Sequence, residues 1–128
     1  MKRENISTGG KWEPILGYSR AVKVGQFVYV SGCTAATPEG IVGGNDPYLQ
    51  AVQTIKTIVT ALEKAGAGPE HVVRTRIFMT DISQWEQIAK AHGEVFGSVR
   101  PATTLLEVSK LIDPGMLVEI EADAIVPE

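Results

Sequence analysis

The pattern of apolar and polar residues predicts a β-hairpin near the start of the chain. Residues 19–32 contain two runs rich in β-branched and aromatic residues, and Gly25-Gln26 separates them, a connection short enough for a hairpin. The second run, Phe27 to Val30, is apolar throughout, which indicates a strand buried on both faces. Residues 34–45 contain four glycines or prolines and are interpreted as a loop.

Two helices are predicted after this loop. Asp46 and Pro47 suit the start of the first, because an aspartate side chain caps exposed amides and proline tolerates the first helical position. Apolar residues then recur at helical spacing until Gly66 ends the segment. Residues 83–86, Ser-Gln-Trp-Glu, have the pattern of a capping box, which predicts a second helix that runs to about Gly97.

Three more strands are predicted, within residues 71–81, 103–108 and 117–126. In the first of these, alternation places Val73, Thr75, Ile77 and Met79 on one face. The element order is therefore ββαβαββ, an α+β domain spanning residues 1–128 in which both helices cover one face of a mixed sheet. The other face carries arginines and glutamates beside apolar residues, a mixture that favours contact with a partner chain.

Composition and charge narrow the classes of function. The chain has 128 residues and a formal net charge of −3, without a basic run, so neither nucleic acid nor an acidic membrane is an expected partner. The first ten residues lack the apolar core of a signal peptide, and no apolar run is long enough for a membrane helix. Cys33 is the single cysteine and has no internal disulfide partner, so a cytoplasmic protein is expected.

Several segments resemble the RidA/YjgF family of reactive-intermediate deaminases. They are PATTLLEV at residues 101–108, VEIEADAIV at 118–126, Gly17-Tyr18, and Val30-Ser31-Gly32. The resemblance implies a chorismate-mutase-like fold and a homotrimer, with three sheets packed into a barrel and sites at the subunit interfaces. It implies cofactor-free hydrolysis of reactive enamines or imines, such as 2-aminoacrylate, to 2-oxo acids and ammonia. The family also carries the older labels translation inhibitor and endoribonuclease, and the second fits poorly with a net charge of −3.

The chain departs from the family pattern at the position that matters most for a carboxylate. Thr103 stands where active members have an arginine that clamps the substrate carboxylate. A guanidinium offers two parallel charge-assisted bonds and a hydroxyl one neutral bond, a loss of about 1 kcal/mol or more. Gly17 and Cys33 replace the family's proline and glutamine. Two functions therefore stay open: hydrolysis of an imine, enamine or related metabolite, and binding of a small metabolite without turnover.

Glu119 is the candidate catalytic residue, because it matches the family carboxylate that positions the attacking water. The alternative is a structural carboxylate that forms an ion pair with Arg74 or Arg76 across the sheet. Tyr18 matches the family tyrosine of the pocket, and the alternative is a structural anchor at a strand start. Ser31 and Gly32 lie at the end of the second predicted strand, in a family segment, and are also assigned to ligand binding.

Two arginines are candidates to replace the missing carboxylate clamp, and a third residue occupies the clamp's position in the motif. Arg76 is the preferred replacement, with an ion pair to Glu119 or Glu121 as its alternative, and Arg100 is the second, with a solvated loop arginine as its alternative. Thr103 is assigned to ligand binding only because it occupies the motif position of the family arginine. Cys33 is assigned to the ligand site as well, and a small buried thiol is the competing interpretation. A metal ion is not expected, since the histidines and Cys33 lack ligand spacing, and the family resemblance implies that no cofactor is needed.

Overall fold

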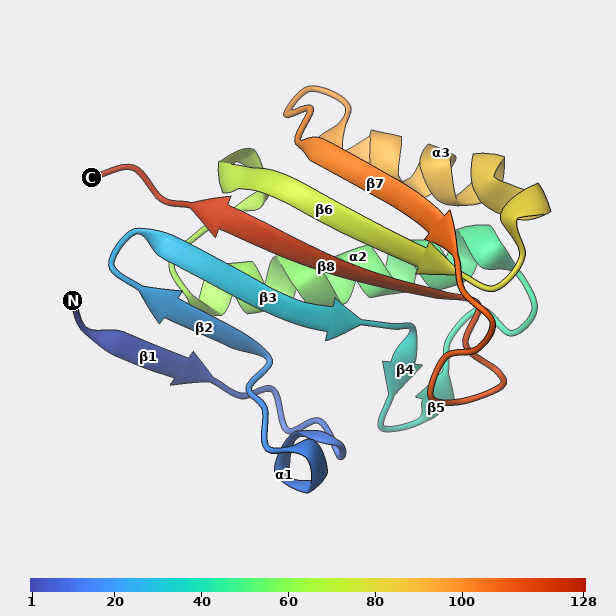
Figure 1. The fold of residues 1–128 in the computed structure, drawn as a ribbon, viewed down its shortest axis with the longest axis horizontal. Helices are drawn as coiled ribbons and strands as arrows, with labels where there is room; N and C mark the ends of the chain where they lie inside the picture. The colour runs from blue at the N-terminus through green and yellow to red at the C-terminus, as the bar shows by residue number, and fades with distance from the viewer.

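A six-stranded mixed sheet is the frame of the protein (Figure 1), and the computed structural model describes all of residues 1–128. The strands lie in the order β1-β2-β3-β8-β6-β7. Their bounds are Arg3–Ile6, Ala21–Val24, Phe27–Cys33, Val118–Ile125, Val72–Met79 and Ala102–Glu107 in that order. All neighbouring pairs are antiparallel except β6 and β7, which are parallel because α3 connects them.

Two helices, α2 (Pro47–Lys64) and α3 (Trp85–Phe96), pack side by side on one face of this sheet (Figure 1). Their buried side chains and the sheet's inner face form one cluster of 21 buried apolar residues. The Asp46 side chain accepts a hydrogen bond from the Leu49 amide at 3.1 Å, so α2 begins where the sequence predicted. The α+β class with both helices on one face is thus confirmed.

Several short elements were not predicted, and most of them lie near the same edge of the sheet. They are β1, a one-turn helix α1 (Glu13–Leu16), a two-stranded hairpin of β4 (Ala36–Thr37) and β5 (Gly40–Ile41), and the 3-10 turns η1 (Pro69–His71) and η2 (Ile82–Gln84). Each is four residues or fewer, too short to show a periodic pattern. The order ββαβαββ therefore holds only for the longer elements.

The expectation that the strand from Phe27 to Val30 is buried on both faces is wrong for the single chain. Val28 and Val30 are buried, but Phe27 and Tyr29 are 41% and 50% exposed. The helices cover only one face of the sheet, so alternate residues of β3 point to the uncovered side. Val73 is likewise exposed and Val72 is buried, because the pairing of β6 with β8 shifts register between Val72 and Arg74.

The start of α3 also differs from the prediction. The Asp81 carboxylate, and not a capping box at residues 83–86, accepts hydrogen bonds from the Ser83 amide at 3.0 Å and the Ser83 hydroxyl at 2.6 Å. These bonds close the 3-10 turn η2, and α3 follows it at Trp85 without a side-chain cap. The helix ends at Phe96, one residue before the predicted limit.

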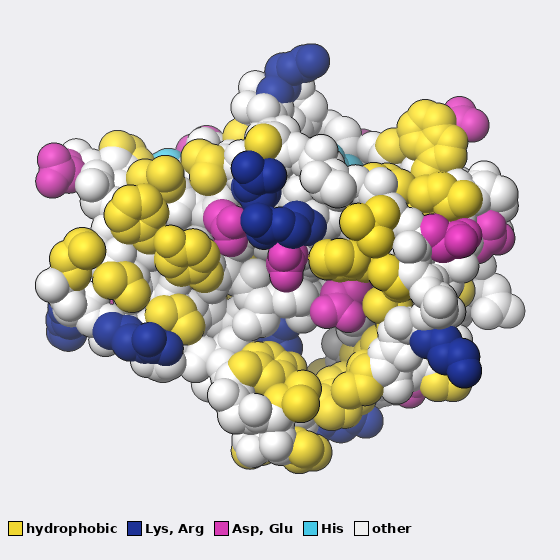
Figure 2. All heavy atoms as spheres, in the orientation of Figure 1, with side chains coloured by type: hydrophobic (Ala, Val, Ile, Leu, Met, Phe, Trp, Pro, Cys, Tyr) yellow, Lys and Arg dark blue, Asp and Glu magenta, His cyan; other side chains and the backbone are white.

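The face of the sheet without helices, here called the open face, is visible in Figure 2. Apolar side chains gather there over the beginning of β3 and the end of β8, beside a central group of charged side chains. Exposed apolar residues of these strands are Phe27, Tyr29 and Ile125. None of the helices has the length and apolar composition that crossing a membrane requires.

Candidate functional site

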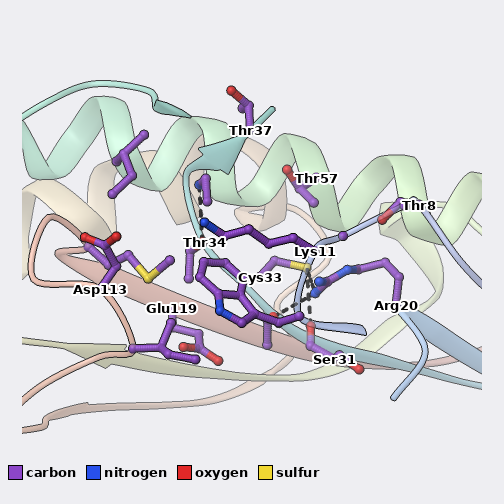
Figure 3. Close-up of a pocket in the computed structure, with 18 of the residues that line it drawn as sticks. Thr8, Lys11, Arg20, Ser31, Cys33, Thr34, Thr37, Thr57, Asp113 and Glu119 are labelled. Atoms are coloured by element: carbon purple, nitrogen blue, oxygen red, sulfur yellow. Dashed lines mark hydrogen bonds between the residues drawn. The ribbon is translucent and has the colours of Figure 1, made fainter. Parts of the chain in front are cut away.

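A cavity of about 890 Å³ opens beside α1 and the β4–β5 hairpin (Figure 3), and a hollow marks the same region of the surface in Figure 2. Its walls come from residues 8–20, the end of β3, the β4–β5 hairpin and the segment that leads into β8. We call it the Glu119 cavity. Its volume lies within the range of about 300–1,000 Å³ that is typical of small-molecule sites.

Five of the residues assigned from the sequence line this one cavity. They are Tyr18, Ser31, Gly32, Cys33 and Glu119. The pairing of β3 with β8 shifts register between Val30 and Cys33, so β3 carries one extra residue there. This bulge opens the sheet at Ser31 and Gly32. The Ser31 hydroxyl donates to the Ser19 carbonyl at 2.6 Å, which ties the bulge to the start of the hairpin.

Gly32 and Glu119 are in direct contact. A Cβ atom at Gly32 would overlap the Glu119 carboxylate, and the Cδ and Cγ atoms of that side chain would lie at 2.9 and 3.1 Å from it. The absence of a side chain at residue 32 therefore makes the room in which the carboxylate lies. Gly32 has no positive φ angle, so this contact, and not the backbone conformation, is what favours glycine here.

The Glu119 carboxylate belongs to none of the ion pairs in the chain. Burial raises its pKa above the ordinary glutamate value, the nearby Glu121 charge raises it further, and Arg20 acts in the opposite direction. The ion pair with Arg74 or Arg76 that was the structural alternative for Glu119 is not formed. In its place, Arg76 pairs with Glu121 at 3.1 Å and with Asp123 at 3.4 Å.

Arg20 is a cavity residue that the sequence did not reveal. The residue is only 8% exposed, and its guanidinium lies beside Cys33 at the cavity wall (Figure 3). It donates to the Gly32 carbonyl at 2.8 Å, to the Cys33 sulfur at 3.5 Å and to the Tyr18 hydroxyl at 3.2 Å. A lone arginine before a strand carries no motif, so only the alternation that buries Ala21 and its neighbours could have drawn attention to it.

Cys33 is buried beside this guanidinium. Burial raises the pKa of its thiol to about 11; the Arg20 charge lowers it and the Glu119 charge raises it. A thiol with this pKa is protonated at neutral pH and is a poor nucleophile. Cys33 thus lines the cavity as a small apolar group, in agreement with the competing interpretation made from the sequence.

The outer walls of the cavity are held by hydrogen bonds from two buried side chains. The Glu13 carboxylate accepts from the Gly10 amide at 2.8 Å, which orders the segment carrying Lys11 and Trp12. Gln50, which is fully buried, donates to Gly44 at 2.6 Å and to Gly115 at 2.9 Å. It also accepts from the Leu117 amide at 2.9 Å. These bonds join α2 to the loops that enclose the site.

Arg76, Arg100 and Thr103 do not line the Glu119 cavity of their own chain. Arg76 lies on β6 and is held by its acidic neighbours on β8. Arg100 has a positive φ of 59° and lies beside a smaller cavity of about 290 Å³ next to α3. The Thr103 hydroxyl lies 2.8 Å from the Thr75 hydroxyl and donates to the Pro101 carbonyl at 3.1 Å. Any contribution of the three to the Glu119 cavity would have to come from a second copy of the chain.

Comparison with known proteins identifies the family to which this chain belongs. The model of the family described as Endoribonuclease L-PSP matches residues 9–126. The uncharacterized protein SCO2049 of Streptomyces coelicolor is 40% identical over 119 residues, which cover 93% of this chain and 89% of that protein. The RutC family protein PYRAB12510 of Pyrococcus abyssi is 35% identical over 125 residues, covering 97% of this chain and 98% of that protein.

Solved structures agree with this result. Rv2704 from Mycobacterium tuberculosis, described as a member of the highly conserved YjgF/YER057c/UK114 family, is similar with a TM-score of 0.89 at 45% identity, covering 98% of this chain and 100% of that one. The E. coli YjgF gene product has a TM-score of 0.83 at 25% identity, covering 95% and 98%. The architecture is that of the YjgF/UK114 proteins. The chain belongs to the RidA/YjgF family, as its C-terminal segments predicted.

Proposed function

We propose that this protein hydrolyses a reactive imine or enamine in the Glu119 cavity, without a cofactor. The observation that carries the proposal is a carboxylate with a raised pKa that forms no ion pair and faces a cavity of ligand size. Membership of the RidA/YjgF family supports it, because the family's active members perform this reaction.

The reaction needs one group that moves protons in both directions. Water adds to the imine carbon and forms the C–O bond, Glu119 takes the proton that this water loses, and the C=N π electrons go to nitrogen. The nitrogen of the carbinolamine then takes the proton back from Glu119, the hydroxyl group gives up its proton as its oxygen forms the C=O bond, and the C–N bond breaks to leave a 2-oxo acid and ammonia. An enamine first takes a proton at its terminal carbon. A raised carboxyl pKa makes Glu119 a stronger base than an ordinary glutamate, which suits it to accepting a proton and returning it.

The proposal includes a homotrimer. The open face leaves Phe27, Tyr29 and Ile125 between 41% and 50% exposed on one sheet, and apolar side chains of this kind favour a partner surface. A neighbouring chain packed on this face or on the β7 edge would bring Arg100 and Thr103 toward a cavity other than their own. The subunit-interface site that the family resemblance implies is this arrangement.

A second candidate function is metabolite binding without turnover. It is favoured by one specific observation: the Thr103 hydroxyl is already engaged by Thr75 and Pro101, so this position holds no free group for a carboxylate. Loss of the clamp would weaken catalysis on small imino acids and leave a pocket that binds a related compound. The family's endoribonuclease label is less well supported, because the net charge of −3 gives no electrostatic attraction to RNA.

Ammonia release separates these functions. Imino acids are generated in the assay from several amino acids by an amino acid oxidase, and their loss is compared with and without the protein. Glu119→Gln keeps the shape of the side chain but removes its basicity, so turnover should fall by about 10²-fold. A binder would show no release above buffer and a thermal shift with 2-oxo acids. Full activity of the variant would remove Glu119 from the mechanism.

Thermal stability on the same variant distinguishes catalysis from structure. The raised pKa means that the folded state holds the Glu119 proton more tightly than the unfolded chain does. The ionised side chain therefore lowers stability once the pH rises above its unfolded pKa. Glu119→Gln removes that penalty, so the melting temperature at pH 7 should be unchanged or higher. A large decrease would mean that the carboxylate has a structural partner in the assembly.

A further inference from the structure

Arg20 is a buried cation that forms no direct ion pair. The residue is 8% exposed, and none of the three ion pairs in the chain includes it. Buried charges in proteins are normally paired, because an unpaired charge pays its full desolvation cost. The partners that Arg20 does have, a carbonyl oxygen, a thiol and a phenol, are all neutral. The Glu13 and Glu119 carboxylates act on this charge only from beyond ion-pair distance, so the Glu119 cavity contains a fixed positive charge that no acidic side chain contacts directly.

The guanidinium also keeps donors free. It carries five N–H groups, and three are used by Gly32, Cys33 and Tyr18. Nη1 makes two of these bonds and Nη2 makes one, while the buried Nε makes none. Nε and Nη2 lie on the same edge of the guanidinium plane. A carboxylate grips such an edge with two parallel hydrogen bonds; here Nε is enclosed, so this grip requires the side chains around Nε to move.

Arg20 and Glu119 meet at the same residue from two sides. The Gly32 carbonyl accepts from Arg20, and the Gly32 Cα side is in contact with the Glu119 carboxylate. A ligand whose carboxylate lies on the guanidinium therefore occupies the same cavity as the Glu119 carboxylate. In a 2-imino acid the carbon next to the carboxylate is the electrophilic one, to which water is added.

We infer that Arg20 is the carboxylate-binding residue of this cavity, in the role of the arginine that Thr103 replaces, and that the ligand is a 2-imino acid with a bulky apolar side chain. The inference rests on the proposed function. The preference for a bulky apolar side chain rests on the size of the cavity, about 890 Å³, and on the apolar residues of its lining, which include Trp12, Leu16, Ile41, Ile112 and Met116. A three-carbon acid such as 2-aminoacrylate would leave most of this apolar lining without contact.

Binding of unreactive probes tests the inference apart from turnover. Phenylpyruvate carries both the carboxylate and a bulky apolar group, phenylacetone lacks the carboxylate, and pyruvate lacks the bulk. Calorimetry on the wild type should rank phenylpyruvate above the other two. Arg20→Gln should weaken phenylpyruvate by about 10- to 100-fold, the range for a lost charge-assisted pair, and leave phenylacetone unchanged. Arg3→Gln is the matched control, because Arg3 is exposed, bonds only to Asn5 and does not line the cavity.

The outcomes separate the two proposals. Phenylpyruvate binding that depends on Arg20, with no ammonia release from the matching imino acid, overturns hydrolysis and supports Arg20. Equal binding of phenylpyruvate by wild type and Arg20→Gln, or equal binding of phenylpyruvate and pyruvate, overturns the inference. If Arg20→Gln does not fold, the wild type still decides: the Arg20 Nε–H resonance should move downfield with phenylpyruvate and not with phenylacetone. An unmoved resonance overturns the inference.

Discussion

Placing one methyl group at Gly32 is the sharpest perturbation of the site that the structure offers. A Cβ atom there overlaps the Glu119 carboxylate, whose Cδ atom would lie at 2.9 Å. The overlapped atoms are the end of a flexible side chain and not backbone, so the carboxylate moves and the strand does not. Gly32 lacks a positive φ angle, so alanine is compatible with its backbone conformation. Gly32→Ala should therefore displace Glu119 while the fold persists.

The sizes of the two effects differ greatly. Restoring ordinary van der Waals contact requires the carboxylate to shift by more than about 1 Å, and a misplacement of about 1 Å can already cost about 10²-fold in rate. The effect on stability is small, because an alanine at a compatible position restricts the unfolded chain and stabilises by about 0.4–1 kcal/mol. That gain offsets the cost of moving the side chain. Turnover should fall about 10²-fold with a change of only a few degrees in melting temperature.

The assay is ammonia release and thermal denaturation on two alanine variants. Gly93→Ala is the matched control, since a Cβ there meets no atom within 4 Å and the residue lies in α3. It should stabilise the helix by about 0.8–1 kcal/mol and leave turnover unchanged. Wild-type turnover in Gly32→Ala would show that the position of Glu119 does not govern the reaction. A variant that loses both activity and stability would assign Gly32 to the structure of the bulge.

Two further predictions follow from the buried thiol and the open face. Because the pKa of Cys33 is about 11, iodoacetamide at pH 8 should label the folded protein far more slowly than the unfolded chain. Rapid labelling of the folded protein would contradict the burial of the thiol. The folded thiol keeps its proton above the ordinary pKa of 9.0, so the contribution of Cys33 to stability should fall as the pH rises from 9 to 11. The urea midpoints of the wild type and Cys33→Ala, compared over this pH range, measure that contribution. Sedimentation equilibrium should give three chains of 13.8 kDa, and a stable monomer at micromolar concentration would remove the interface sites.

The longer elements of the fold were predictable because local chemistry and periodicity agree in them. Asp46 and Pro47 mark the start of α2, and strict alternation marks β8, where every second residue from Val118 is buried. The prediction failed for Phe27 and Tyr29, since an apolar run has the same pattern whether one or both faces are covered. The tertiary structure determines which face of the sheet the helices cover, and the sequence of β3 alone does not reveal it.

The candidate site was predictable only where a motif names a residue. Tyr18, Ser31, Gly32, Cys33 and Glu119 came from family segments, and they line one cavity. Arg20 has no motif, and its importance comes from burial and from the neutrality of its partners, which only coordinates reveal. The outer walls come from segments at residues 8–16, 36–41 and 112–116, which are far apart in the sequence and carry no shared pattern.

The acidic residues on β8 differ in ion pairing because different side chains lie opposite them on β6. Glu121 is opposite Arg76 in the pairing with β6, and Asp123 is close enough to share the same guanidinium. Glu119 is opposite Phe78, which offers it no charge. It therefore turns toward Gly32 at the bulge of β3, where burial raises its pKa. The phenylalanine opposite it explains why Glu119, unlike Glu121 and Asp123, has no ion-pair partner.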